Sequence, residues 1–211
     1  MADRPDHILP YGLAALGLGL GTLVITFYSL GETDVSYARA QMTAWLAMAL
    51  ATFAILWYAA GTIEEPSSRA VWRGFWTAGF LAYALHFFWA VYRTYDGEYG
   101  AIIEHQGTLI AYANFIATAI WALDVIAVWL PRKMTESRPI IKWLHFVVWL
   151  WVTVTFAVSA FRTGPIQYVG YVFDGLVILT LALRLRAFIQ NAGANQNGGR
   201  DPPKTAGAIP A

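Results

Sequence analysis

The stretch that decides the fold is Tyr83–Gly107, which reads YALHFFWAVYRTYDGEYGAIIEHQG. Its first half is an apolar run that contains His86, and its second half holds Arg93, three acidic residues and His105. Such a run is stable only in a protein core or a lipid bilayer, whereas the charged half needs water. The stretch therefore has the form of a membrane-spanning helix that ends at an outer boundary near Arg93 and continues into an exposed loop.

The composition of the whole chain agrees with this interpretation. Of its 211 residues, 58% are hydrophobic and 13% are charged, a balance typical of integral membrane proteins. The chain has no cysteine. Disulfides, cysteine zinc sites, thiol redox chemistry and covalent attachment of a c-type haem are therefore excluded, whereas noncovalent cofactors are not.

Apolar runs long enough to cross a bilayer, about 20 residues each, occur six times. They predict an all-α bundle of six transmembrane helices within residues 1–190, with spans at about 9–30, 41–62, 71–94, 107–130, 139–161 and 166–187. The first run has no cleavage site of the signal-peptide kind, so we expect it to be retained as a helix. Residues 191–211 are rich in Gly, Pro and Asn and predict a disordered cytoplasmic tail.

The basic residues predict the orientation, because Lys and Arg accumulate on the cytoplasmic side. With both termini inside, the outer side holds only Arg39, Arg93 and Arg162. The inner side then holds the remaining basic residues, which are Arg4, Arg69, Arg73, Arg132, Lys133, Arg138, Lys142, Arg184, Arg186, Arg200 and Lys204. We expect a multi-pass protein of the bacterial inner membrane with both termini in the cytoplasm.

Ionisable side chains inside a bilayer are costly and often functional, and their depths can be compared. His86 precedes Arg93 by seven residues and so lies about 10 Å below that boundary at 1.5 Å per residue. His145 precedes Arg162 by seventeen residues, or roughly 25 Å. The two histidines are thus about 15 Å apart along the membrane normal and cannot be the two axial ligands of one haem.

Each histidine therefore needs its own partner. For His145 the candidate is Asp124, which precedes Arg132 by eight residues and so lies at a similar depth. A carboxylate on one imidazole nitrogen would make the other nitrogen a better ligand or proton carrier, although a structural hydrogen bond is the alternative. Asp174 lies near mid-membrane beside Gly175, where another helix could approach closely. It is either a proton relay or a neutral or hydrogen-bonded side chain.

His86 has no partner at its own depth that the sequence identifies. A haem held by His86 and His105, or by His86 with a weak or absent second ligand, is one hypothesis, and a hydrogen bond to a neighbouring helix is the other. The outer loop gathers Asp96, Glu98 and Glu104 around His105. These donors could hold a divalent metal, but their spacing matches no defined motif, and a solvated acidic loop that balances Arg93 is the simpler interpretation.

Three of the spans resemble a known family. RAVWRGFWTAGFLAYALHFFWAVY, IIKWLHFVVWLWVTVTF and YVGYVFDGLVILTLALRLRAF are similar to the ferric-reductase-like transmembrane domain, and in size and layout to the haem-binding membrane subunit of periplasmic methionine sulfoxide reductase systems. The resemblance covers about residues 70–187. It implies b-type haem, with His86 as a third-helix ligand and His145 as the inner histidine of the fifth helix. The family's outer histidine on that helix corresponds to Val158 here, so His86 lacks this partner.

The resemblance and the buried histidines together predict a haem-binding protein that passes electrons from quinol or a cytoplasmic donor toward the periplasmic side. Haem b, with quinone as a further possibility, is the expected cofactor. The expected partners are the lipid bilayer and another membrane or periplasmic protein, and not nucleic acid. One alternative is a non-enzymatic accessory subunit of a respiratory or photosynthetic membrane complex. The other is a small transporter that uses Asp124 and Asp174 to couple transport to protons.

Overall fold

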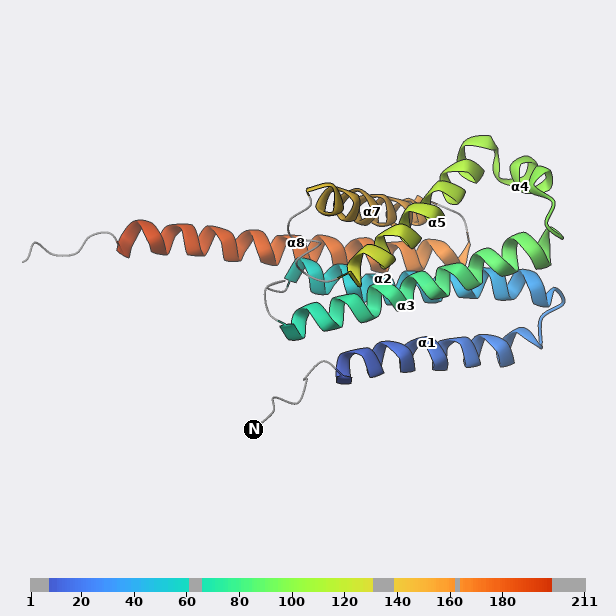
Figure 1. Cartoon of the computed structure of the whole chain (residues 1–211), viewed down its shortest axis with the longest axis horizontal. Coiled ribbons are helices and arrows are strands. Elements are labelled where there is room, and N and C mark those ends of the chain that lie inside the picture. The colour runs from blue at the N-terminus through green and yellow to red at the C-terminus, as the bar shows by residue number, and fades with distance from the viewer. Residues whose placement is uncertain (1–7, 61–65, 131–138, 162–163, 199–211) are drawn as a thin grey trace, which may run out of the picture.

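The computed structural model describes residues 8–60, 66–130, 139–161 and 164–198, and every regular element in these ranges is a helix (Figure 1). Six helical segments are long and apolar enough to cross a membrane, namely Ile8–Ser29, Val35–Tyr58, Ser68–Thr94, Thr108–Val128, Pro139–Ala157 and Gln167–Arg186. The predicted all-α bundle of six membrane-spanning helices is therefore confirmed.

The long helices are α1 Ile8–Ser29, α2 Val35–Ala60, α3 Pro66–Phe88, α5 Thr108–Val128, α7 Pro139–Ala157 and α8 Pro165–Gly198. Three short helices complete the described chain: the π-helix η1 Trp89–Thr94, α4 Tyr99–Gln106 and the 3-10 helix η2 Val158–Phe161. Because η1 continues α3 and η2 continues α7, the third and fifth spans end where the sequence predicts.

The structure differs from the prediction in the connections that precede α2 and α5. Helix α2 begins at Val35 instead of residue 41, because Asp34 Oδ1 accepts the backbone N–H of Tyr37 at 2.9 Å and so caps the helix. The second half of the predicted acidic loop, which contains Glu104 and His105, folds into α4, whereas Asp96 and Glu98 precede this helix. Gly107, at φ +85°, separates this short helix from α5.

The C-terminal segment also differs from the prediction. Helix α8 runs to Gly198, so the first eight residues of the segment 191–211, predicted to be a disordered tail, are helical. A long apolar helix precedes them, so the costly nucleation step is already complete and each further residue adds a backbone hydrogen bond. Residues 199–211 of the predicted tail lie outside the described residues.

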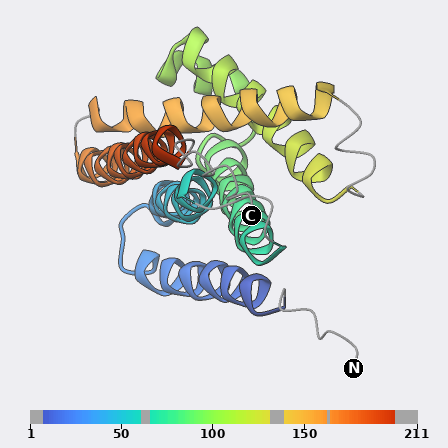
Figure 2. The same cartoon turned by 90° about the vertical axis from the view of Figure 1, so that its left-hand side faces the viewer.

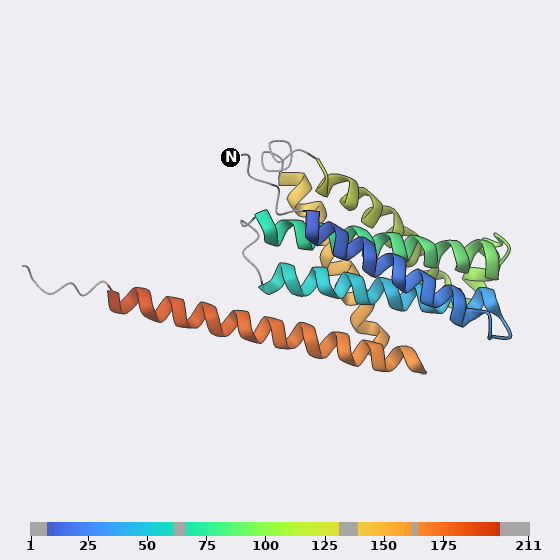
Figure 3. The same ribbon diagram turned by 90° about the horizontal axis from the view of Figure 1, so that it is seen from below.

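Helices α2 and α3 lie at the centre of the bundle, with α1 on one side and α5, α7 and α8 on the other (Figure 2). Helix α4 lies at one end of the bundle, which we call the α4 end (Figure 1). The first turn of α1 and the C-terminal half of α8 lie at the other end, which we call the opposite end. Figure 3 shows that α7 crosses α2 and α3 obliquely.

The central pair of helices is held together by small residues. A Cβ atom added at Gly79 of α3 would lie 3.0 Å from the backbone nitrogen and 3.2 Å from the Cα atom of Ala51 in α2. Ala47, Ala51 and Ala54 are completely buried along this side of α2. Small residues let two helix backbones approach closely, which is a common means of association in membranes.

The glycines of the first span differ in their surroundings. A Cβ atom added at Gly17 or Gly21 of α1 would meet the side chain of Leu50 or Leu46 of α2, so the helices pack closely there, whereas one added at Gly19 would meet nothing within 4 Å. The close helix approach predicted at Gly175 is wrong, because an added Cβ there would also meet nothing within 4 Å. Gly175 lies on an exposed face of α8, so its small size serves no helix contact within the described residues.

Large apolar side chains cover the outside of the bundle. Exposed examples on five of the long helices are Leu16, Leu23, Phe27, Phe53, Ile126, Trp143, Leu150, Val172 and Leu179. A soluble protein rarely exposes this much contiguous apolar surface. The surface is consistent with contact with a lipid bilayer.

Candidate functional site

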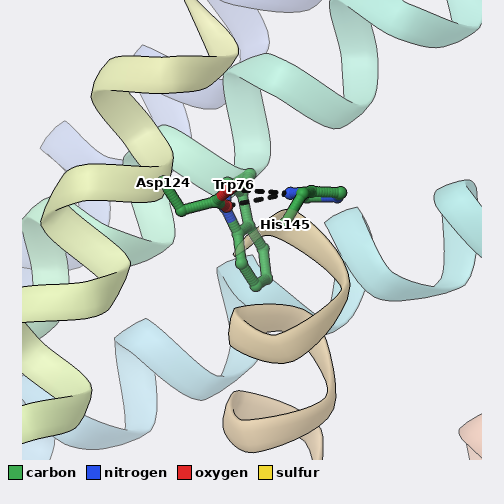
Figure 4. A network of polar contacts seen from close by, with 3 residues as sticks. All are labelled: Trp76, Asp124 and His145. Carbon is green, nitrogen blue, oxygen red and sulfur yellow. Dashed lines mark hydrogen bonds and ion pairs between the residues drawn. The ribbon is translucent and has the colours of Figure 1, made fainter. Parts of the chain in front are cut away.

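The centre of the candidate site is the carboxylate of Asp124 on α5, which has no exposed surface. The Nε1–H group of Trp76 on α3 donates to Asp124 Oδ2 at 2.9 Å. His145 on α7 places Nδ1 at 2.9 Å from Oδ2 and 3.1 Å from Oδ1 (Figure 4). Three helices that are distant in the sequence therefore meet at one buried carboxylate.

The hydrogen bonds of this site limit where protons can lie. When Asp124 is ionised its carboxylate only accepts, and His145 then donates an Nδ1–H to it. Figure 4 shows that the far edge of the imidazole points away from the carboxylate. Its Nε2 atom is buried and has no hydrogen-bond partner among the described residues. One imidazole nitrogen is thus occupied and the other is open to a proton or a ligand.

Aromatic rings surround His145. The centroid of its ring lies 4.7 Å from that of Trp72, 5.5 Å from Tyr58 and 6.1 Å from Trp76. Tyr58 also contacts Trp149, with ring centroids 6.0 Å apart. The indole Nε1–H groups of Trp72 and Trp149 are buried without a hydrogen-bond partner among the described residues, as His145 Nε2 is.

The contact between His145 and Asp124 confirms the prediction from residue depths. The Trp76 donor was missed, although a signal for it exists in the sequence. Trp76 precedes Arg93 by seventeen residues, the same spacing as His145 before Arg162, so the same counting places it at the depth of His145.

His86 lies elsewhere, near the α4 end. Its Nδ1 is 2.8 Å from the backbone oxygen of Ala40 in α2, and a carbonyl only accepts, so Nδ1 carries the hydrogen. The hypothesis of a hydrogen bond to a neighbouring helix is confirmed. The adjacent Arg39 donates from Nε to Ser29 Oγ at 2.9 Å, and its guanidinium lies 4.7 Å from the ring centroid of Trp89.

The structure keeps the two membrane histidines apart. His145 contacts the rings of Trp72 and Trp76, whereas His86 follows Trp76 by ten residues along α3, which is about 15 Å. This distance agrees with the predicted separation in depth. His86 and His145 are not brought together at one site.

The remaining candidates do not join either histidine. His105 is exposed on α4, where its ring lies 5.8 Å from that of Tyr95. Arg93, Asp96, Glu98 and Glu104 are also exposed. Within the described ranges, no three His, Asp or Glu side chains gather in a group that could hold a metal ion.

Asp174 lies on α8, half-buried, and none of the hydrogen bonds found among the described residues includes its side chain. It therefore differs from Asp124, whose carboxylate is fully buried and bonded on two sides. The two aspartates are not one site in this structure.

Haem, which the family resemblance implies, needs a free imidazole nitrogen and room for a porphyrin beside it. The donor chemistry fits at both histidines, because a carboxylate or a carbonyl on Nδ1 leaves Nε2 free, as in most metal-binding histidines. The surroundings of His145 do not fit, because Tyr58 and Trp72 enclose its ring and Nε2 is covered by protein. Haem binding through Nε2 of His86 stays a prediction.

No protein-family model matches the sequence, and neither a curated protein nor a solved structure matches it.

Proposed function

We propose that this is a proton-coupled membrane protein in which Asp124 and His145 together bind and release a proton inside the bilayer. One observation carries the proposal: a fully buried carboxylate is bonded to an imidazole whose second nitrogen is buried and unpartnered. Histidine and acidic residues within membrane spans commonly mark proton relays and ion pathways.

The geometry supports both protonation states of the pair. With His145 neutral, Nδ1–H donates to Asp124 and Nε2 has a free lone pair. A proton that binds at Nε2 creates an imidazolium, and the carboxylate 2.9 Å away offsets the cost of placing this charge in apolar surroundings. The N–H of Trp76 stabilises the ionised form of Asp124 in each state.

The membrane location supports a coupled role. We place the protein in the bacterial inner membrane with both termini in the cytoplasm, since the Lys and Arg residues are concentrated at that side in this orientation. A proton held within six spans can be coupled to the movement of a solute or to electron transfer toward a partner across the membrane. Of these, solute transport needs no further cofactor, and we take it as the process to test first.

Sealed vesicles with an acidic interior provide the test of function. Solutes of several classes are added outside, and loss of the pH gradient is followed with a fluorescent amine. We expect one class of solute to collapse the pH gradient in vesicles that contain the wild-type protein. The same solute should leave the gradient unchanged in vesicles with Asp124→Asn or His145→Gln. Asp174→Asn is the matched control, because it removes a membrane carboxylate that lacks a histidine partner. Full activity in both site variants would contradict the proposal.

Infrared spectroscopy tests proton binding without knowledge of the solute. Acidification of the purified protein in lipid is expected to produce imidazole and carboxylate difference bands that His145→Gln removes and Asp124→Asn alters, whereas Asp174→Asn keeps them. Identical difference spectra for the wild type and His145→Gln would show that the pair takes up no proton.

The second candidate is the haem-binding electron-transfer protein that the resemblance implies. The observation that favours it is the hydrogen bond from His86 Nδ1 to the carbonyl of Ala40, which orients the ring and leaves Nε2 free to bind iron. Haem bound at His86 would supply one-electron chemistry near the α4 end. Purified protein with a Soret band that is lost in His86→Ala, but not in His105→Ala, would support this candidate, and protein without a Soret band would exclude it.

A further inference from the structure

We propose that the pair of Asp124 and His145 exchanges its proton with water only at the opposite end of the bundle, through a hydrated path along Tyr58. This inference rests on the proposed function and adds the route and the side from which the proton arrives. It depends on a difference between the two sides of the pair: unpartnered polar atoms gather on the side of Tyr58, and aromatic rings pack together on the α4 side.

The open side is marked by polar atoms without partners. Nε2 of His145 and the indole N–H groups of Trp72 and Trp149 are all buried and unbonded among the described residues, and all three rings contact Tyr58. Each such atom costs about 1–3 kcal/mol when it is left without a hydrogen bond. Three of them around one tyrosine indicate ordered water, which commonly fills polar gaps in protein interiors.

Tyr58 connects this gap with the end of the bundle. It lies in the last turn of α2, whose C-terminal end is at the opposite end of the bundle. Its ring lies 5.5 Å from that of His145 by centroid distance, so Tyr58 lies between the buried pair and this end of the bundle.

Within the described residues, the ionisable groups on the helices around the pair at this end are mainly basic. They are Tyr11 on α1, Tyr58 on α2, Arg69 and Arg73 on α3, Lys142 on α7, and Arg184 and Arg186 on α8. Asp124 is thus an acidic group among mainly basic neighbours within the described residues.

The other side is closed by aromatic rings. The ring of Trp121 lies 5.0 Å from that of Trp76, 5.8 Å from Phe80 and 5.4 Å from Tyr83 by centroid distance. Trp121 precedes Asp124 on α5, while Phe80 and Tyr83 follow Trp76 on α3, so both helices place these rings on the α4 side of the carboxylate. Trp121 Nε1 also lacks a partner among the described residues, and the hydroxyl of the neighbouring Tyr83 bonds to Thr118. This side therefore holds one unpartnered polar atom, compared with three around Tyr58.

The proton balance of the path is simple. On uptake, a hydronium ion at the opposite end gives its proton through the water chain and the Tyr58 hydroxyl to Nε2 of His145, and it becomes water. On release the same proton returns to water by the reverse steps. No bond between heavy atoms is formed or broken.

Cysteine labelling tests the side of access, because the chain has no cysteine of its own and every introduced one is unique. Trp149→Cys probes the path, and Ala117→Cys probes the closed side. Lys142→Cys and Glu104→Cys mark the opposite end and the α4 end. A charged, membrane-impermeant methanethiosulfonate is added to sealed vesicles of each orientation. We expect the cysteine at 149 to react only where that at 142 reacts, and the cysteine at 117 to react in neither. Reaction of the cysteine at 117 or 149 where that at 104 reacts would overturn the proposal.

A kinetic measurement tests the role of Tyr58 in a variant that keeps its ring. Tyr58→Phe is expected to slow the rise of the imidazole bands after a pH jump by about tenfold or more, and to leave the final spectrum unchanged. Tyr168→Phe, at an exposed tyrosine of α8, is the matched control with the wild-type rate. An unchanged rate in Tyr58→Phe would refute the path while the bands persist, whereas absence of the bands in the wild type would refute the proposed function itself.

Discussion

Replacement of Trp76 by phenylalanine separates the hydrogen bond to Asp124 from the packing of the indole. The change removes the Nε1–H donor, 2.9 Å from Oδ2, and keeps an aromatic ring in the same place. A hydrogen bond to a charged group contributes about 1.5–3 kcal/mol. The smaller ring also leaves about 40 Å³ unfilled, which costs roughly 1 kcal/mol at about 24 cal/mol per Å³. We therefore expect Trp76→Phe to lower the free energy of unfolding by about 2.5–4 kcal/mol.

Trp121 offers a control of matched size and burial. It is 1% exposed, compared with 0% for Trp76, but its Nε1 donates to no described residue. Trp121→Phe thus makes the same loss of volume without the loss of a hydrogen bond, and we expect it to cost about 1 kcal/mol or less. The difference between the two variants, about 1.5–3 kcal/mol, then measures the bond to Asp124.

Equilibrium unfolding in mixed micelles, with the mole fraction of a denaturing detergent as the variable, gives both free energies. The two variants are compared with the wild type under the same lipid and pH conditions. Equal destabilisation by Trp76→Phe and Trp121→Phe would refute the reasoning, because it would mean that the carboxylate gains nothing from the indole N–H.

Three further predictions concern the bundle itself. Gly79→Ala should destabilise the protein by about 1–3 kcal/mol, because its new Cβ meets the α2 backbone 3.0 Å away. Gly19→Ala is the control and should be neutral or slightly stabilising, because its Cβ meets nothing within 4 Å. Thermal unfolding compares the two variants. Asp34→Ala should cost about 0.5–2 kcal/mol through loss of the α2 cap, which unchanged detergent unfolding would contradict. Arg39→Gln should cost about 1–2 kcal/mol by breaking the contacts with Ser29 and the indole, seen as a lower midpoint of thermal unfolding.

The membrane spans could be predicted because the bilayer sets their length and marks their ends. The thickness of the hydrocarbon layer requires about 20 apolar residues, and arginines lie at the boundaries, so both the spans and the depth of Asp124 and His145 follow from counting. The contact between these two residues was predictable for the same reason. Depth along a helix is a one-dimensional property that the sequence contains directly.

The direction of each side chain around its helix could not be predicted in the same way. Lipid and protein interior are equally apolar, so residues that face a partner helix resemble those that face lipid. Gly175 illustrates this, since it lies on an exposed face, whereas Gly79 meets the α2 backbone. The partner of His86 is a backbone carbonyl, which every residue has and no residue type reveals. Helix α4 was missed because its eight residues are too short for a periodic pattern.

The protonation of His145 in a bilayer tests the central proposal most directly. Solid-state NMR of the ¹⁵N-histidine-labelled protein distinguishes protonated from bare imidazole nitrogens, and comparison with His145→Gln assigns the signals. We predict that at alkaline pH the His145 ring carries its hydrogen on Nδ1 and has a bare Nε2, that acidification protonates Nε2, and that Asp124→Asn removes the preference for the Nδ1–H form. An Nε2 that stays protonated at all pH values, or a His145 signal that acid leaves unchanged, would contradict a proton-carrying pair at Asp124 and His145.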